Sequence, residues 1–126
     1  MPLLIPEDYE YLAKCTMRVE EDEATRYLMF RAWSLPPNLY TVDTVDVLVT
    51  IPTNYNDQGN DMFWVYPPLQ RKDGQPISNL IQNEKHYAGL AWQRWSRHWE
   101  QRPWRVGIDN VRSIKRRIAW CLERGT

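Results

Sequence analysis

A chain of 126 residues is long enough for one domain and too short for two independent cores. Apolar residues make up 43% and charged residues 25% of the chain, which excludes a disordered chain, a collagen-like repeat and a coiled coil. No stretch approaches the roughly 18 apolar residues that a membrane span requires, and acids follow the first residues where a signal peptide carries bases. We therefore expect a cytoplasmic protein with no membrane partner.

The formal net charge is zero, but the charges are unevenly distributed along the chain. Residues 1–66 carry 11 acids and 4 bases, whereas residues 67–126 carry 5 acids and 12 bases. The two halves therefore have net charges of about −7 and +7. This division has two interpretations. Either the second half provides a basic binding face, or the two halves complement each other within one domain.

The chain begins with a predicted amphipathic helix. Ile5, Tyr9, Leu12 and Ala13 recur at helical spacing, and Pro6 suits the first helical turn. Four segments rich in β-branched and aromatic residues follow, and they predict strands at about 16–21, 26–33, 42–51 and 62–66. Because the connections between these segments are too short for parallel crossovers, we expect a four-stranded antiparallel meander.

Prolines and turn residues predict a long irregular segment from residue 67 to about residue 90. Trp92, Trp95 and Trp99 then recur at i, i+3 and i+7, which predicts a short helix with one aromatic face. For this face, packing in the core is favoured over a ligand cage.

A second amphipathic helix closes the chain. Its apolar stripe consists of Ile108, Val111, Ile114, Ile118, Cys121 and Leu122. Arginines and a lysine lie outside this stripe. The predicted fold class is therefore α+β, with an N-terminal helix, a four-stranded antiparallel meander, a long irregular segment, a short helix and a C-terminal helix.

The sequence predicts no cofactor and no metal site. Common nucleotide-binding, zinc-protease and CxxC motifs are absent. Cys15 and Cys121 stand 106 positions apart, with no second ligand at zinc spacing. Both are expected to be free thiols, and their apolar neighbours favour buried small side chains over reactive nucleophiles.

The segment KHYAGLAWQRWSRHW contains both histidines of the chain, His86 and His98, together with Ser96. An imidazole can take the proton that makes a serine hydroxyl nucleophilic, so these three residues are the candidate catalytic residues. The alternative is structural: Ser96 caps a turn and His98 satisfies a backbone carbonyl. On a helical turn, residues two apart do not face each other, so a Ser96–His98 hydrogen bond requires the segment to be non-helical.

The order of elements and several short motifs resemble the ubiquitin-conjugating-enzyme family over residues 5–124. IPTNY matches the aliphatic-Pro-x-x-Tyr motif of that family through Ile51, Pro52 and Tyr55, although Asn56 stands where a proline usually follows. Trp104 is similar to the Trp before the next helix. The family places its catalytic Cys about eight residues before that Trp and the His of an HPN tripeptide about ten residues earlier. These positions hold Ser96 and His86, with Tyr87 and Ala88 in place of the Pro and Asn.

The resemblance implies a single domain of this fold over residues 1–126. The segment WQRWSRHW, followed by W-x-x-G-x-D, is most similar to a divergent bacterial branch of the superfamily. For that branch the resemblance implies three partners: a ubiquitin-like protein, an activating-enzyme homologue and a JAB-type peptidase. It also implies a phage-defence operon as one setting.

A serine at the cysteine position excludes transthiolation there and leaves two readings of the resemblance. In the first, the protein is an acyl transferase: Ser96 accepts a ubiquitin-like C-terminus as an oxyester, with His98 or His86 as base and Arg97 or Asn83 as oxyanion donor. In the second, the protein is a non-catalytic binding module. A third function, nucleic-acid binding through the basic C-terminal half, is disfavoured by the isoelectric point of about 6.7.

Overall fold

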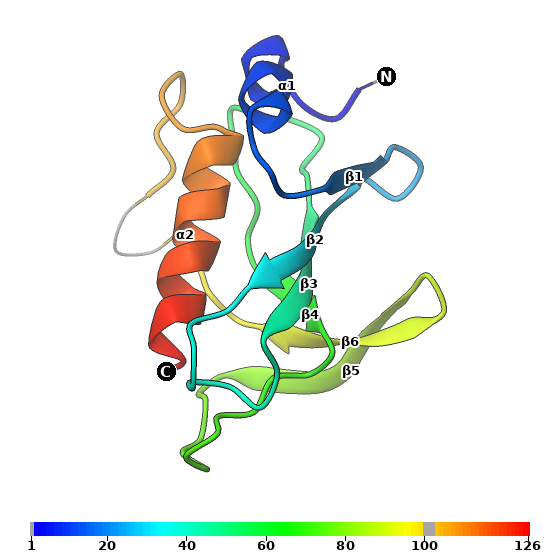
Figure 1. Cartoon of the computed structure of the whole chain (residues 1–126). Helices are drawn as coiled ribbons and strands as arrows, with labels where there is room; N and C mark the ends of the chain where they lie inside the picture. The colour runs from blue at the N-terminus through cyan, green and yellow to red at the C-terminus, as the bar shows by residue number, and fades with distance from the viewer. Residues whose placement is uncertain (1, 100–102) are drawn as a thin grey trace.

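The computed structural model describes residues 2–99 and 103–126, and Figure 1 shows an antiparallel sheet with a long helix against one face. In chain order, the elements are α1 (Pro6–Ala13), β1 (Val19–Asp22), β2 (Tyr27–Ser34), β3 (Thr44–Thr50), β4 (Phe63–Tyr66), β5 (Leu80–Tyr87), β6 (Leu90–Trp95) and α2 (Val111–Arg124).

The sheet has six strands in the order β1-β2-β3-β4-β6-β5, and every neighbouring pair is antiparallel. The predicted α+β class, the N-terminal helix and the first four strands are confirmed. The predicted four-stranded meander is wrong, because two further strands extend the sheet beyond β4.

The predicted irregular segment up to residue 90 contains the hairpin of β5 and β6. Its two-residue turn, Ala88-Gly89, has φ values of 53° and 76°, and two positive φ values are typical of a tight hairpin turn. Ala88 is not a usual residue at such a position, which conceals the turn in the sequence. β5 is an edge strand whose side chains are mostly exposed, so its polar sequence carries little strand signal.

The short helix predicted around Trp92, Trp95 and Trp99 is also wrong, because residues 90–95 form β6. In a strand, residues three apart point to opposite faces of the sheet. Trp95 accordingly packs in the main core, whereas Trp92 packs in a second cluster on the other face, and both are fully buried. A spacing of three fits one face of a helix or two buried faces of a strand, so the sequence alone does not distinguish them.

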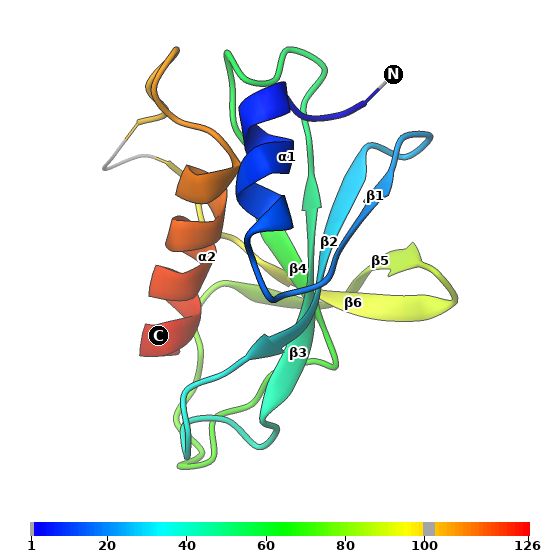
Figure 2. The same ribbon diagram turned by 45° about the horizontal axis from the view of Figure 1, so that its top comes forward.

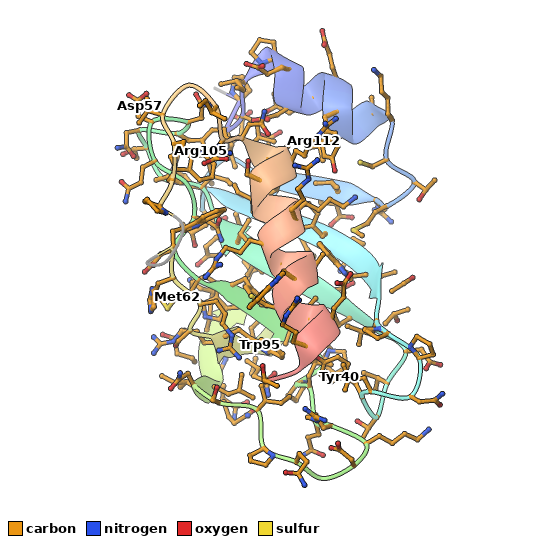
Figure 3. All side chains as sticks on the ribbon, turned by 90° about the vertical axis from the view of Figure 1, so that its left-hand side faces the viewer. Tyr40, Asp57, Met62, Trp95, Arg105 and Arg112 are labelled. Carbon is orange, nitrogen blue, oxygen red and sulfur yellow. The ribbon has the colours of Figure 1, made fainter. Side chains whose placement is uncertain are left out.

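The main core lies between the sheet and α2, which crosses the strands in Figure 3. The inward side chains of α2 are Val111, Ile114, Ile118, Cys121 and Leu122. Ile108, which the sequence places in this stripe, precedes the helix and is 61% exposed. The helix begins after Asn110, whose side chain accepts a hydrogen bond from the Arg112 backbone N–H (3.0 Å).

A second apolar cluster of Met29, Leu48, Trp64 and Trp92 covers the opposite face of the sheet. The sheet curls around it, so that β5 reaches the strands at the other edge. The Tyr87 hydroxyl donates to Asp22 (2.8 Å), and the rings of Tyr87 and Tyr27 meet edge to face at 4.8 Å. The curl shields indoles that a flat sheet would leave in water.

One buried carboxylate joins three distant segments. Asp8 in α1 is 1% exposed, and its two oxygens accept hydrogen bonds from the Tyr55 hydroxyl (2.5 Å) and from the first backbone N–H of α2, at Val111 (3.1 Å). Figure 2 shows α1 beside the N-terminal half of α2. Burial, and then the contact with Asp8, raise the pKa of the Tyr55 phenol well above its ordinary value. The IPTNY segment is therefore bound to both helices.

Neither helix in the described ranges is long and apolar enough to cross a membrane.

Candidate functional site

Ser96 follows directly after the last residue of β6. Its backbone N–H donates to the carbonyl of Asn79 (3.1 Å), which continues the pairing between the two strands of the hairpin by one residue. The side chain is partly exposed, and residues 96–98 are neither helix nor strand. The helical geometry that would separate Ser96 from His98 is therefore absent from this segment.

His98 pairs with a carboxylate that the sequence analysis did not single out. Its Nδ1 lies 2.6 Å from Oδ1 of Asp61, and the two side chains are 42% and 65% exposed. β4 and β6 are neighbours, with Phe63 opposite Trp95, so the residues before β4 run beside the residues after β6. Asp61 lies in the turn-rich run DQGND, and only the strand pairing shows that it meets His98.

Two tryptophans hold the segment after Ser96 against the loop before β4. The Trp99 indole donates to the carbonyl of Asn60 (2.7 Å), and the Trp104 indole donates to the carbonyl of Asn56 (2.9 Å). The two rings meet edge to face at 5.3 Å. Gly59 lies against the Trp104 ring, and a Cβ atom at this position would overlap it. These contacts fix the loop that carries Asp61.

His86 lies elsewhere. It is exposed on β5, opposite Ala91, and Ala91 lies five positions before Ser96 along β6, which is roughly 16 Å at about 3.3 Å per residue. The structure therefore brings His98 to the Ser96 segment and leaves His86 toward the other end of the hairpin. Asn83, a predicted oxyanion donor, is exposed in the irregular part of β5 with a φ of 51°.

Arg97, the other predicted oxyanion donor, makes contacts of its own. Its guanidinium stacks 4.8 Å from the ring of Trp95 and donates to the carbonyls of Ser78 (3.1 Å) and Ser96 (3.2 Å). Burial lowers the pKa of Arg97 from its ordinary value. This side chain fixes the exit from β6 and keeps a positive charge beside Ser96.

Neither cysteine is an exposed nucleophile at this site. Cys121 is a free thiol, 3% exposed on the inner face of α2, and burial raises its pKa although Arg117 and Arg97 oppose that shift. Cys15 is a half-buried free thiol whose sulfur lies 3.6 Å from the Lys115 ammonium. Within the described part of the chain, no three His, Cys, Asp or Glu side chains are grouped so as to hold a metal ion.

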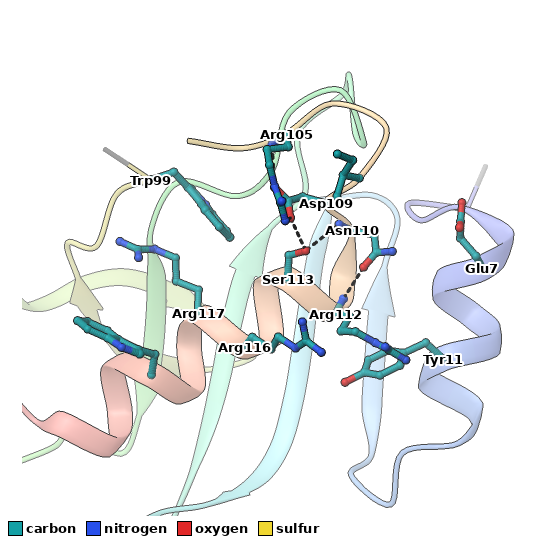
Figure 4. A pocket seen from close by; sticks show the side chains of 12 residues that line it. Glu7, Tyr11, Trp99, Arg105, Asp109, Asn110, Arg112, Ser113, Arg116 and Arg117 are labelled. Carbon is teal, nitrogen blue, oxygen red and sulfur yellow. Dashed lines mark hydrogen bonds and ion pairs between the residues drawn. The ribbon is translucent and has the colours of Figure 1, made fainter. Parts of the chain in front are cut away.

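A pocket near this segment lies over the N-terminal half of α2 and has a volume of about 670 Å³. Figure 4 shows Trp99 and Arg117 at one side of it and Tyr11 of α1 at the other. Arg117 stacks 5.2 Å from the ring of Trp99 and donates to the backbone carbonyl of His98. The pocket and the Ser96–Trp99 segment are therefore contiguous.

The six residues of the W-x-x-G-x-D motif form the turn that begins α2. Asp109 is 2% exposed and accepts the backbone N–H of Arg105 (2.7 Å) and the hydroxyl of Ser113 (2.8 Å). Gly107 has a φ of 78°, a left-handed conformation that favours glycine. Burial acts to raise the pKa of the Asp109 carboxyl, but the hydrogen bonds from Arg105 and Ser113 outweigh it and hold the pKa below its usual value.

Comparisons with known proteins identify the family. Searches of curated proteins and of solved structures found no match to this chain. A family model described as Prokaryotic E2 family E matches residues 4–125, which is nearly the whole sequence. The chain therefore belongs to the prokaryotic E2 family E, a bacterial family of proteins similar to ubiquitin-conjugating enzymes.

Proposed function

We propose that this protein carries the C-terminus of a ubiquitin-like protein as an oxyester on Ser96, with His98 as the general base and Asp61 as the residue that orients it. The observation that carries this proposal is the 2.6 Å contact between His98 Nδ1 and Asp61 Oδ1. An ionised carboxylate only accepts hydrogen bonds, so this contact favours the tautomer with the proton on Nδ1 and a lone pair on Nε2. A base oriented by a carboxylate is the arrangement that activates serine in hydrolases.

The spacing of the two residues supports the same assignment. Ser96 and His98 are two residues apart in a segment that is neither helix nor strand, so helical geometry does not turn the two side chains away from each other. His86 has no part in the proposed reaction because it lies toward the other end of the hairpin.

The loading step transfers an acyl group from sulfur to oxygen. The Ser96 oxygen attacks the carbonyl carbon of a thioester held by an activating-enzyme homologue. A C–O bond forms and the C–S bond breaks, while the Ser96 proton passes to His98 Nε2 and then to the departing sulfur. In the second step an acceptor nucleophile attacks the oxyester, and the proton returns to the Ser96 oxygen. Arg97 provides positive charge near the carbonyl oxygen.

We place this reaction in a bacterial ubiquitin-like modification pathway in the cytoplasm. Its partners are then a ubiquitin-like protein, an activating-enzyme homologue and a JAB-type peptidase that processes the products. Membership of a conjugating-enzyme-like family supports the first two partners.

Mass spectrometry of the intact protein tests this function. The protein is mixed with its activating-enzyme homologue, ATP and the mature ubiquitin-like protein. We expect an adduct that resists reducing agent, is cleaved by hydroxylamine, and is absent from Ser96→Ala but present in Cys121→Ala. Loss of the general base slows such steps about 10²–10⁴-fold, so His98→Gln should form the adduct that much more slowly than His86→Gln. An adduct that reducing agent removes, or that persists in Ser96→Ala, would contradict the proposal.

A second candidate is a scaffold that binds the same two partners without chemistry. It is favoured by one observation: within the described residues, no hydrogen bond joins the Ser96 hydroxyl to the His98 ring. Binding of the ubiquitin-like protein with no adduct in any variant would support the scaffold. Nucleic-acid binding is less well supported, because Trp92 and Trp95 are fully buried and not available to stack on bases.

A further inference from the structure

The pocket over α2 is rich in arginine. Among the residues that the structure describes, Arg105, Arg112, Arg116 and Arg117 line it, together with two carboxylates, Glu7 and Asp109. Asp109 is buried and is paired with Arg105 through two oxygens. Figure 4 shows the two side chains beside each other. Asp109 therefore does not neutralise the three arginines of the helix. We call the surface formed by these lining residues the arginine cleft.

Two of the helix arginines are held in place by aromatic rings. The guanidinium of Arg112 lies 4.8 Å from the ring of Tyr11, and that of Arg117 lies 5.2 Å from the ring of Trp99. A stacked guanidinium keeps its N–H groups at the edge, where they can bind carboxylates, and loses less side-chain entropy when it does so. Arg116 is exposed between them.

The contacts between charged side chains lie mostly within one half of the chain. The carboxylate pairs of Arg18, Arg31, Arg71, Arg94 and Arg105 are each formed within one half, and the hydrogen bond between His98 and Asp61 joins the two halves. The first of the two interpretations of the charge asymmetry is therefore favoured. The positive charge of α2 remains available to a partner.

The surroundings of the cleft are apolar as well as basic. Val106, Ile108 and Trp120 are 65%, 61% and 53% exposed, and the last two line the cleft. Exposed apolar side chains beside charged ones are typical of protein interaction sites. A phosphate ion would use only the arginines, whereas a peptide with acidic and aliphatic side chains would use both kinds of surface.

We propose that the arginine cleft binds an acidic, partly aliphatic peptide segment of the protein that accepts the acyl group from Ser96. This inference rests on the proposed function and adds the substrate class. Trp99 lines the cleft and is three residues from Ser96, roughly 10 Å at about 3.3 Å per residue. A peptide held in the cleft brings an acceptor side chain a few residues away to the oxyester. Acceptor sites should therefore be flanked by Asp or Glu and by aliphatic residues.

Direct binding is measured first, without any acyl donor. The probe is a fluorescent 12-residue peptide of alternating Glu and Leu with one central Lys, and the comparison peptide has Gln in place of every Glu. We expect the Glu peptide to bind the wild type, with an affinity that falls as the salt concentration rises. Its affinity for Arg112→Glu/Arg116→Glu should be at least tenfold lower than its affinity for the wild type. Both side chains are exposed, and a carboxylate at position 112 lies in the first turn of α2, where it is favourable, so this variant should fold.

The matched control is Lys14→Glu/Lys72→Glu, which makes the same change in net charge at two exposed positions outside the cleft. It should bind the Glu peptide nearly as well as the wild type. Equal loss in the control and the cleft variant would overturn the proposal, as would equal binding of the Gln peptide. Binding of a single-stranded oligonucleotide with higher affinity than the Glu peptide would overturn the proposal and indicate a nucleic-acid site. Salt-dependent self-association through the acidic run Glu20–Glu23 would overturn it in favour of a second copy.

Discharge of pre-loaded protein separates this inference from the proposed function. Protein that already carries the oxyester is mixed with either peptide, and loss of the adduct is followed by mass. We expect faster transfer to the Glu peptide, and this preference should disappear in Arg112→Glu/Arg116→Glu. Failure to load Ser96 at all would refute the proposed function. Normal loading with no preference between the peptides would refute the peptide site alone.

Discussion

Asp109 shows how a single buried carboxylate can order the region before α2. It accepts hydrogen bonds from the backbone and side chain of Arg105 and from the hydroxyl of Ser113, so it closes the turn and fixes the first turn of the helix. Asp8 acts similarly on the other side, where it binds Tyr55 and Val111. Two carboxylates thus add to the Asn110 side-chain cap at the start of the helix that borders the candidate site.

The low pKa of Asp109 makes the free energy of unfolding depend on pH in the acidic range. A carboxyl whose pKa is lower in the folded state contributes stability above its unfolded pKa of about 3.9, and that contribution is lost as the pH falls through the folded pKa. We expect Asp109→Asn to lower the free energy of unfolding at pH 7, and the difference from wild type to shrink below about pH 4. Urea unfolding between pH 7 and pH 2.5 measures this.

The control for this experiment is Asp57→Asn, at an exposed position. It should leave the pH dependence of wild-type stability essentially unchanged. A difference between Asp109→Asn and wild type that stays constant down to the lowest pH would show that the carboxyl acts by shape and not by charge.

At the scale of elements, α2 is the best-predicted part of the protein. Its apolar stripe at helical spacing survives in the structure, with the exception of Ile108. The sequence includes Ile108 because its spacing fits, but the cap at Asn110 begins the helix later. Periodicity alone does not identify the first helical residue, because that residue depends on which partners satisfy the first N–H groups.

This difference between Ile114 and Ile108 predicts that alanine substitutions at the two positions have unequal effects on stability. Ile114→Ala removes a fully buried side chain between α2 and the sheet, and should lower the free energy of unfolding by about 3 kcal/mol. Ile108→Ala removes an exposed side chain of the same size and should change it by less than about 0.5 kcal/mol. Chemical denaturation of both variants checks the prediction. Equal effects would mean that Ile108 also packs in a core.

β5 and β6 are the elements that the sequence did not predict. Both faces of β6 are buried, so its tryptophans follow no simple alternation, and β5 is polar because it lies at an edge. The pairing of β6 with β4 is a contact between segments about thirty residues apart, and nothing local encodes it. The same pairing brings Asp61 to His98. The base of the proposed site was therefore predictable, but the residue that orients it was not.

At the scale of the whole molecule, the sheet is closed on itself by contacts between its two ends. Tyr87 of β5 packs against Tyr27 and donates to Asp22, and both partners lie on the other side of the second apolar cluster. Lys85 strengthens this closure, since its ammonium lies 4.4 Å from the Trp64 ring and donates to the Tyr27 hydroxyl (2.8 Å). The curl buries Trp92 completely.

Loss of the contact between the two ends of the sheet should change both the stability and the tryptophan fluorescence of the protein. Tyr87→Ala removes an aromatic pair and a hydrogen bond, and should lower the free energy of unfolding by roughly 2 kcal/mol. Its tryptophan emission should also shift to longer wavelength as Trp92 gains contact with water. Ile81→Ala, at a position 42% exposed on the same strand, is the control and should do neither. An unchanged spectrum in Tyr87→Ala would show that the cluster is shielded without the closure.

The sequence by itself determined the helices at both ends and the first four strands, because each depends on local periodicity. Only the tertiary structure decided that His98 and not His86 accompanies Ser96, that Asp61 pairs with His98, and that the positive charges of α2 face an open cleft. The physical reason is strand register. It joins residues far apart in the chain, and no pattern within a single segment specifies which segment will lie beside it.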